Sequence, residues 1–205
     1  MHLKKALEQA REEALNMLRQ DLPPELTYHD IGHTQDVMQA TERLASLEQV
    51  PESDIDLLLT AAAFHDTGYL YSRHEHEEKS CEIARGLLPK LGVDAEVIDS
   101  ICQLILATRM PHEPQNRLEE ILCDADLDYL GRDDYFTISN NVYQEFRHFG
   151  TVKNATEWHD LQLRFLERHR YYTPSSIALR EKKKQENLRR IKEGNSLQPS
   201  PSQSR

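Results

Sequence analysis

The stretch Leu57-Leu58-Leu59-Thr60-Ala61-Ala62-Ala63-Phe64-His65-Asp66 decides how this chain is interpreted. Its apolar run predicts a buried helix, and that helix finishes in an imidazole next to a carboxylate. Removing both groups from water is costly unless something compensates them. A divalent metal ion is the commonest compensation, because neutral His nitrogen and Asp oxygen are both good ligands for it. The His65-Asp66 pair therefore predicts a metal site.

Two other segments supply side chains of the same kind. Tyr28-His29-Asp30-Ile31-Gly32-His33 lies upstream of the pair, and Cys123-Asp124-Ala125-Asp126 lies downstream. His33 shares its helix face with Val37 and Leu44, so we expect its side chain to point inward.

The two downstream aspartates differ in direction. Asp126 continues the apolar stripe of Leu118 and Leu122, whereas Asp124 lies about 160° away around the helix at roughly 100° per residue. We expect Asp126 to be the ligand, and Asp124 to cap the helix or to support the site from behind.

The position of His29 depends on where its helix begins. If the helix begins early, His29 and His33 share one face because they are four residues apart. If Asp30 is the N-cap, His29 lies just outside the helix and is able to swing over the site.

A metal shared by several helices explains these residues together. Alone, a His on an apolar face is usually a satisfied core residue, and an Asp at a helix end is usually a cap. Here apolar stripes on three separate helices end in His33, His65, Asp66 and Asp126. Burying four ionisable groups without a cation would be expensive, so one common ion is favoured.

Composition limits the classes of function. The chain has 205 residues, 38% of them hydrophobic and 29% charged, which is typical of one soluble globular domain. It has no apolar run of the roughly 20 residues that a membrane span needs and no apolar signal core at its start, so we expect a cytoplasmic protein that binds no membrane. The net charge of −10 argues against nucleic acid as a partner but permits a nucleotide substrate.

Apolar spacing predicts an all-α fold of about nine helices. The period is helical nearly throughout, and no convincing strand alternation occurs. Gly68 and Gly92 are expected to stop the third and fourth helices, and Thr173-Pro174 to begin the ninth, which runs to about Glu193. Residues 194–205 are low in complexity and predict a disordered tail.

The ordered set His33, His65-Asp66 and Asp126 resembles the HD superfamily of metal-dependent phosphohydrolases. The segments around these residues, together with His76-Glu77-Glu78-Lys79-Ser80, are similar to small bacterial HD-domain proteins. The resemblance implies one helical HD domain over residues 1–193, with a core motif region at 24–131 and a helical extension at 132–193. It also implies that His33, His65, Asp66 and Asp126 hold the metal.

The chain departs from relatives that bind two metals. His76 fits the first extra ligand position, but Ala107-Thr108-Arg109 stands where a His pair would be expected. His112 follows in a loop, where a solvated side chain is the commoner situation. Tyr69 stands where some nucleotidase relatives carry a glutamate. The missing His pair weighs against a full two-metal site, and the missing glutamate leaves a catalytic base of the nucleotidase kind unsupported.

The leading hypothesis is hydrolysis of a phosphate ester, in a nucleotide or similar small molecule. A divalent ion (Mn, Mg, Co, Ni, Fe or Zn) would activate a water, with Asp66 anchoring the ion. His29 is a candidate proton donor to the leaving oxygen, and Thr67 would either orient the water or cap the helix end. His76, Lys79, Arg109 and His112 are candidates for a second metal or for phosphate, although Lys79 and Arg109 also fit solvated surface cations.

Two other functions stay open at this stage. One is a metal-containing module that binds a nucleotide or regulates without turnover, favoured by the missing glutamate and the missing His pair. The other, ranked lowest, is a di-iron oxygenase of the HD type. The sequence names neither the substrate nor the oligomeric state.

Overall fold

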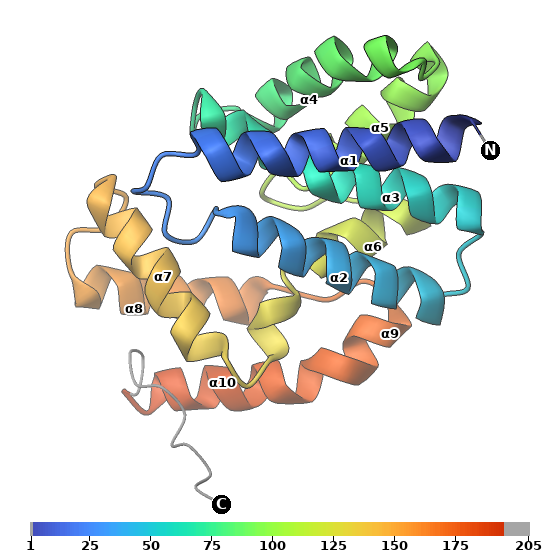
Figure 1. Cartoon of the computed structure of the whole chain (residues 1–205). Coiled ribbons are helices and arrows are strands. Elements are labelled where there is room, and N and C mark those ends of the chain that lie inside the picture. Colours follow the sequence, from blue (N-terminus) through green and yellow to red (C-terminus); the bar gives the residue numbers. More distant parts are fainter. Residues whose placement is uncertain (1, 195–205) are drawn as a thin grey trace, which may run out of the picture. The chain divides into compact units, whose positions relative to one another are not determined.

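The computed structural model describes residues 2–194, and every regular element within them is a helix (Figure 1). The predicted all-α fold is confirmed. The predicted tail lies outside the described residues except for Gly194. The helices, with short turns labelled η, are α1 His2–Asp21, α2 Ile31–Leu47, α3 Glu52–Phe64, η1 Thr67–Leu70, α4 His76–Leu87, η2 Leu88–Leu91, α5 Ala95–Ala107, α6 Arg117–Asp126, η3 Asp128–Gly131, α7 Tyr135–His148, α8 Ala155–Arg168, α9 Pro174–Ser176, η4 Ile177–Glu181 and α10 Lys182–Lys192.

The last three elements form one continuous helical run, which is the predicted ninth helix. Thr173 caps its start, because its side-chain oxygen accepts from the backbone N–H of Ser176 at 3.1 Å. Pro174 occupies the first helical position, where its missing N–H costs nothing.

The described chain divides into two compact units. Unit 1 consists of residues 2–24 and 29–126, and unit 2 consists of residues 25–28 and 127–194. The division falls directly after Asp126, inside the predicted core motif region. The single domain over residues 1–193 stays a prediction.

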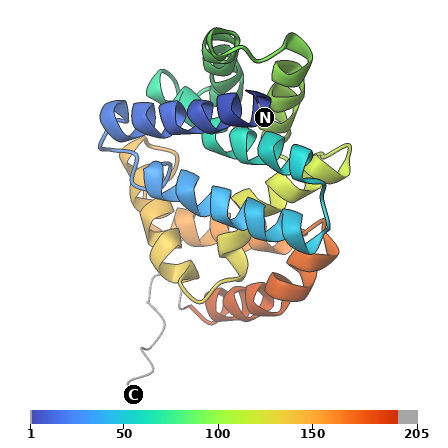
Figure 2. The ribbon, with the colours of Figure 1, turned by 45° about the vertical axis from the view of Figure 1, so that its right-hand side comes forward.

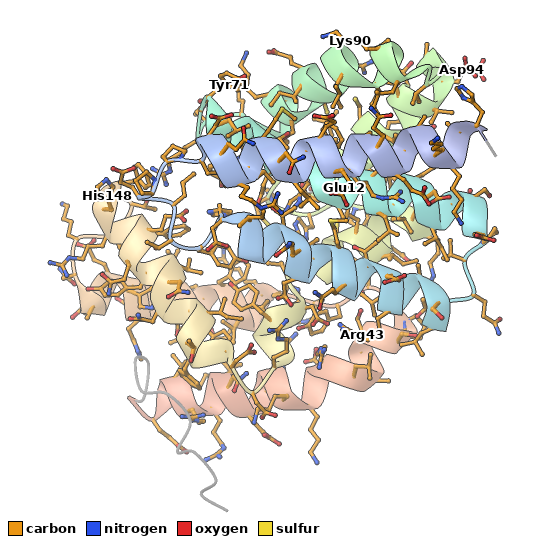
Figure 3. All side chains as sticks on the ribbon, in the orientation of Figure 1. Glu12, Arg43, Tyr71, Lys90, Asp94 and His148 are labelled. Carbon is orange, nitrogen blue, oxygen red and sulfur yellow. The ribbon has the colours of Figure 1, made fainter. Side chains whose placement is uncertain are left out.

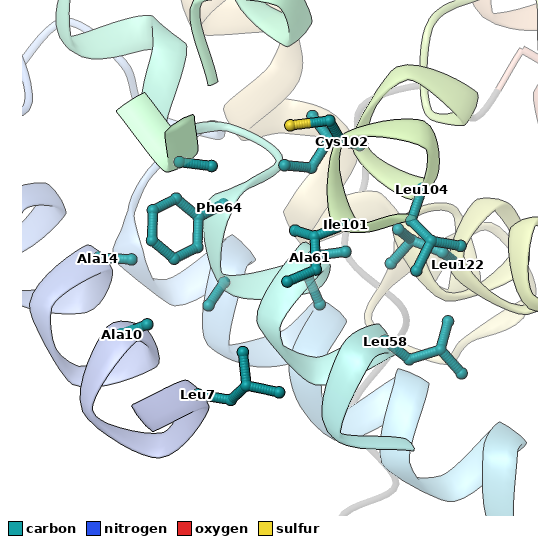
Figure 4. Packing of buried hydrophobic residues seen from close by; sticks show 14 of the residues in the cluster. Leu7, Ala10, Ala14, Leu58, Ala61, Phe64, Ile101, Cys102, Leu104 and Leu122 are labelled. Carbon is teal, nitrogen blue, oxygen red and sulfur yellow. The ribbon is translucent and has the colours of Figure 1, made fainter. Parts of the chain in front are cut away.

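Helix α3 is the central helix of unit 1. It packs against α1, α2 and α5, and its place beside α1 is visible from two directions (Figure 1 and Figure 2). Small side chains contribute to this packing: Ala10 and Ala14 of α1 point toward α3 near Phe64, and Ala61 lies on the side of α3 next to Ile101 of α5 (Figure 4). Leu58 is fully buried, which stabilises the unit by about 1.5–3 kcal/mol. The run Leu57–Phe64 is thus the buried helix that the sequence predicts.

Charged side chains such as those of Glu12, Lys90 and Asp94 lie on the surface of unit 1, together with exposed larger ones such as that of Tyr71 (Figure 3). Among the described residues, no helix is both long and apolar enough to cross a membrane.

Gly68 does not stop α3 as expected. The helix ends at Phe64, and Gly68 lies within the next turn, η1. A Cβ at this position would come within 1.9 Å of the backbone carbonyl oxygen of His76. Glycine is therefore required because the start of α4 passes too close for any side chain. Gly92 has the expected role, since it ends η2 with a left-handed φ of 79°.

Unit 2 is held together by buried polar contacts as well as by apolar ones. Arg180 donates to both carboxylate oxygens of Asp128, at 2.8 and 2.9 Å, and Asn187 donates to the Leu130 carbonyl at 3.0 Å. These bonds fix η4 and α10 against η3. The backbone N–H of Tyr28 donates to the buried Glu145 carboxylate at 2.9 Å, which holds the segment Glu25–Tyr28 in this unit.

Candidate metal centre

The turn after α3 is fixed by hydroxyl groups. Ser80 donates to the His65 carbonyl at 2.6 Å and accepts from the Gly68 N–H at 2.8 Å. Thr67 donates to the Phe64 carbonyl at 2.8 Å, which is the capping bond that the sequence offered as one of two roles for its hydroxyl. All of these groups are buried. The backbone that carries His65 and Asp66 is therefore held in one conformation.

The His65 ring has a defined tautomer. Its Nδ1 lies 2.7 Å from the Ala62 carbonyl oxygen, which accepts hydrogen bonds and never donates them. The proton of the neutral ring must therefore lie on Nδ1, and Nε2 presents a lone pair. Metal-binding histidines are oriented in this way, by a hydrogen bond from the ring nitrogen that does not bind the metal.

His33 enters the site from the first turn of α2. Asp30 is the N-cap, and its carboxylate accepts from the His33 N–H at 2.9 Å. This cap places His29 just outside the helix, the second of the two arrangements that the sequence allowed. The Nε2 atoms of His33 and His65 lie 3.3 Å apart.

Two carboxylates complete the group. Asp66 Oδ2 lies 3.1 Å from His65 Nε2 and 3.4 Å from His33 Nε2. Asp126 Oδ1, from the end of α6, lies 3.6 and 3.1 Å from the same two nitrogens. The structure thus brings together His33, His65, Asp66 and Asp126, all four of the side chains expected to share an ion.

The donor set fits a divalent cation. Ligand atoms of His33, His65 and Asp66 lie within 4.8 Å of one another, and all three side chains are buried. Asp66 Oδ2 is buried and has no hydrogen bond among the described residues, although two ring nitrogens lie close to it. Imidazole nitrogens and carboxylate oxygens that converge on one point are arranged as ligands around a cation.

The electrostatics of the site point the same way. Burial lowers the pKa of His33, but the Asp126 and Asp66 carboxylates outweigh it and raise that pKa to about 9. Burial likewise opposes the net upward shift in the pKa of His65, for which Asp66 is the main cause. Burial raises the pKa of both aspartates, yet the two imidazoles hold each below its usual value. The carboxylates require positive charge beside them, which a divalent ion supplies.

Two more histidines approach the aspartates. His76 Nε2 lies 3.5 Å from Asp66 Oδ1 and 3.5 Å from the buried Glu77 carboxylate, and burial lowers the pKa of His76. His112 Nε2 lies 3.9 Å from Asp126 Oδ2 and 3.0 Å from the Thr108 carbonyl. The His112 side chain is only 4% exposed, so the prediction that it is solvated is wrong.

Aromatic stacking lines the edge of the site. The His29 ring stacks on Tyr69 with centroids 4.4 Å apart, and Tyr69 lies 4.2 Å from the ring of His76. The centroids of His29 and His33 are 5.9 Å apart. His29 is therefore next to the four converging side chains without being one of them.

The candidate phosphate cations are engaged elsewhere. Lys79 pairs with Glu82 at 2.7 Å, and Arg109 pairs with Glu78, with Glu77 4.0 Å away. The two cations are 42% and 48% exposed, as expected of solvated surface side chains. Asp124 is buried and does not join the converging group.

Three residues near the site were not assigned a role from the sequence. Glu77 is buried beside His76, Ser80 fixes the turn, and Tyr69 stacks on His29 and contacts the tilted ring of His76. Only Ser80 left a signal, since it is a hydroxyl on the apolar stripe with Ile83 and Leu87.

Comparison with known proteins agrees with this geometry. The family model for the HD domain matches residues 30–128, a range that includes all four converging side chains. The fold is similar to the crystal structure of a predicted HD superfamily hydrolase from an uncultured Thermotogales bacterium, with a TM-score of 0.59 and 23% identity over 89% of this chain and 90% of that one. At this identity the similarity establishes the fold. No curated protein sequence matches the chain.

Proposed function

This chain belongs to the HD superfamily, and from that premise we propose that it is a metal-dependent hydrolase that cleaves a phosphate ester. The substrate proposed is a nucleotide or a similar small molecule, as the acidic chain is unsuited to a nucleic-acid backbone. The observation that carries the proposal is the convergence of His33, His65, Asp66 and Asp126, with a buried Asp66 oxygen that has no hydrogen bond in the described chain.

The four side chains divide the work of holding a cation. Asp66 and Asp126 supply charge, and His33 and His65 supply neutral nitrogen donors. When bound, a divalent ion such as Mn, Mg, Co, Ni, Fe or Zn lowers the pKa of a bound water and neutralises a phosphoryl oxygen. The least buried of the four is Asp126, 16% exposed, and nearby His76 is 18% exposed. We infer that substrate approaches from this side.

The charges around the site explain why the reaction would depend on metal. Asp66, Asp126 and Glu77 are acidic and buried or nearly so, and they would repel a phosphate group. Lys79 and Arg109 are already paired with glutamates, so they offset little of this charge. Binding of a phosphate ester therefore requires the cation first.

His29 is the group placed to move a proton. It lies outside the metal ligands, half-buried against Tyr69, and an imidazole is a common general acid in enzymes. In this role His29 would donate to the leaving oxygen. Thr67 donates its own proton to Phe64, so its hydroxyl oxygen is left only as an acceptor for a water.

The proposal is tested with protein stripped of metal and reloaded with one ion at a time. Each sample is assayed on a panel of nucleotides and other phosphomonoesters by phosphate release. We expect turnover with at least one ion, lost in Asp66→Ala and kept in the control Asp94→Ala, whose carboxylate is exposed and caps nothing by a hydrogen bond. If no loaded sample exceeds Asp66→Ala on any substrate, the proposal fails.

Two departures from the relatives favour a second candidate function: Tyr69 stands in place of a glutamate, and Ala107-Thr108-Arg109 in place of a His pair. Without those groups, the same centre would serve as a metal-containing nucleotide-binding module without turnover. Calorimetry on the metal-loaded protein measures nucleotide binding, and analysis of the nucleotide afterwards separates the two functions. A binding module binds its nucleotide tightly and leaves it intact, whereas a hydrolase cleaves it. A di-iron oxygenase would require two irons per chain, which metal analysis measures directly.

A further inference from the structure

Unit 2 contains a cavity that the proposed hydrolase chemistry does not use. Its volume is about 140 Å³, and its wall is formed by η3, α7 and α8. Every residue that lines the cavity lies outside residues 30–128, the range that the HD-domain model matches. Most of its wall is apolar, formed by residues such as Val142, Phe146, Phe165 and Leu166.

Two buried polar atoms belong to residues of this wall. The side-chain oxygen Oε1 of Gln162 and the indole Nε1 of Trp158 are buried and have no hydrogen-bond partner in the described part of the chain. Gln162 is only 3% exposed and Trp158 only 5%. A buried acceptor and a buried donor left unpaired are each unfavourable, so both call for a partner.

The two atoms come from successive turns of one helix. Gln162 and Trp158 are four residues apart on α8, so they share a helix face. The amide of Gln162 is held in place, because its Nε2 donates to Ser139 Oγ at 2.5 Å and leaves Oε1 as the open acceptor. A hydroxyl group carries both functions that these two atoms lack, a donor for Gln162 Oε1 and an acceptor for Trp158 Nε1.

We propose that this cavity binds a neutral, flat, apolar molecule of about the size of phenol that carries one hydroxyl group. The size follows from the volume, since an engineered apolar cavity of roughly 150 Å³ takes up benzene. The flat shape suits the aromatic walls, in which Phe146 meets Trp158 edge to face at 5.9 Å. No residue of the wall is charged, which excludes phosphate esters and carboxylates. The proposal is independent of the HD centre.

Phenol and benzene are the probes that test this site. Trp158 is the chain's single tryptophan, so its fluorescence, excited at the red edge of its absorption, reports directly on the cavity wall. We expect both probes to change the fluorescence saturably, with phenol binding about tenfold more tightly than benzene, the upper end for one net hydrogen bond. Equal affinities, or no saturable change with either probe because the cavity holds water only, would overturn the proposal.

A nearly isosteric variant isolates the hydrogen bond. Gln162→Met keeps the length of the side chain but removes the acceptor, and it is expected to weaken phenol binding about tenfold while benzene binding stays within about threefold. The control Gln144→Met, on an exposed position of α7, is expected to bind both probes as the parent does. Equal weakening of both probes would show that the amide contributes only packing.

If Gln162→Met fails to fold, Trp158→Phe tests the donor instead. It removes the indole N–H and keeps an aromatic wall, and binding is then followed by calorimetry. Selective loss of phenol affinity supports the proposal, and unchanged selectivity for phenol over benzene contradicts it.

Discussion

Replacing Gly68 with alanine is expected to destabilise unit 1 and to disturb the metal centre together. The new Cβ would lie 1.9 Å from the His76 carbonyl oxygen, whereas ordinary van der Waals contact begins at 3.4 Å. The atom in the way is backbone, so the start of α4 must move by about 1.5 Å. Overpacking of this kind typically costs about 1–3 kcal/mol.

The same movement strains two hydrogen bonds of Ser80, which links Gly68 to His65. Each is worth about 0.5–1.5 kcal/mol, so the total loss in the free energy of unfolding is about 2–6 kcal/mol. The matched control is Gly86→Ala, in α4, where a Cβ meets nothing within 4 Å. That substitution should stabilise the protein by about 0.5–1 kcal/mol, because alanine favours helix.

Urea unfolding followed by circular dichroism measures both variants. We expect the midpoint to fall for Gly68→Ala and to rise for Gly86→Ala, with unchanged slopes. Metal affinity supplies a second readout, since α4 begins at His76 and Ser80 holds His65. A Gly68→Ala protein as stable as the parent would refute the close approach of Gly68 to the His76 carbonyl.

Three further predictions concern the charges of the site. A divalent ion must displace the proton of His33, whose pKa is raised to about 9. Metal affinity should therefore rise at least tenfold per pH unit between pH 6 and about 8. Calorimetry in two buffers should detect the release of about one proton or more when the metal binds. Metal-free protein should lose about 3 kcal/mol of stability as pH rises from about 6.5 through 9, because the raised pKa of His33 stabilises the folded state only while His33 is protonated. Urea unfolding in the presence of chelator measures this loss. Asp126→Asn should make the free energy of unfolding depend less steeply on pH. Lys79→Ala should leave KM for a phosphoester unchanged, because Lys79 is an exposed partner of Glu82. A tenfold rise in KM would show instead that Lys79 binds the phosphate of the substrate.

Local patterns in the sequence predicted much of the fold. Helix α2 begins at the Asp30 cap, and α3 follows its apolar run to Phe64, because capping and periodicity are properties of neighbouring residues. His33 and Asp126 point inward for the same reason, as each ends a stripe whose apolar members must be buried.

What the sequence did not predict depends on residues far apart in the chain. Gly68 was taken as a helix stop, since nothing local reveals that the start of α4 crosses it. His112 was expected in solvent because it lies in a loop, yet its side chain is buried against the Thr108 carbonyl. The pairing of Arg109 with Glu78 depends in the same way on how α5 and α4 pack.

The converging side chains also bear on how the molecule unfolds. His33 and Asp126 stand near opposite ends of the continuous segment that forms most of unit 1, so an ion held between them cross-links almost the whole of that unit and no part of unit 2. Ligation at one hundred times the dissociation constant adds about 2.7 kcal/mol to whichever species binds it. In a calorimeter, added metal should therefore separate two melting transitions. The melting temperature of unit 1 should rise with the free metal concentration, and that of unit 2 should stay unchanged.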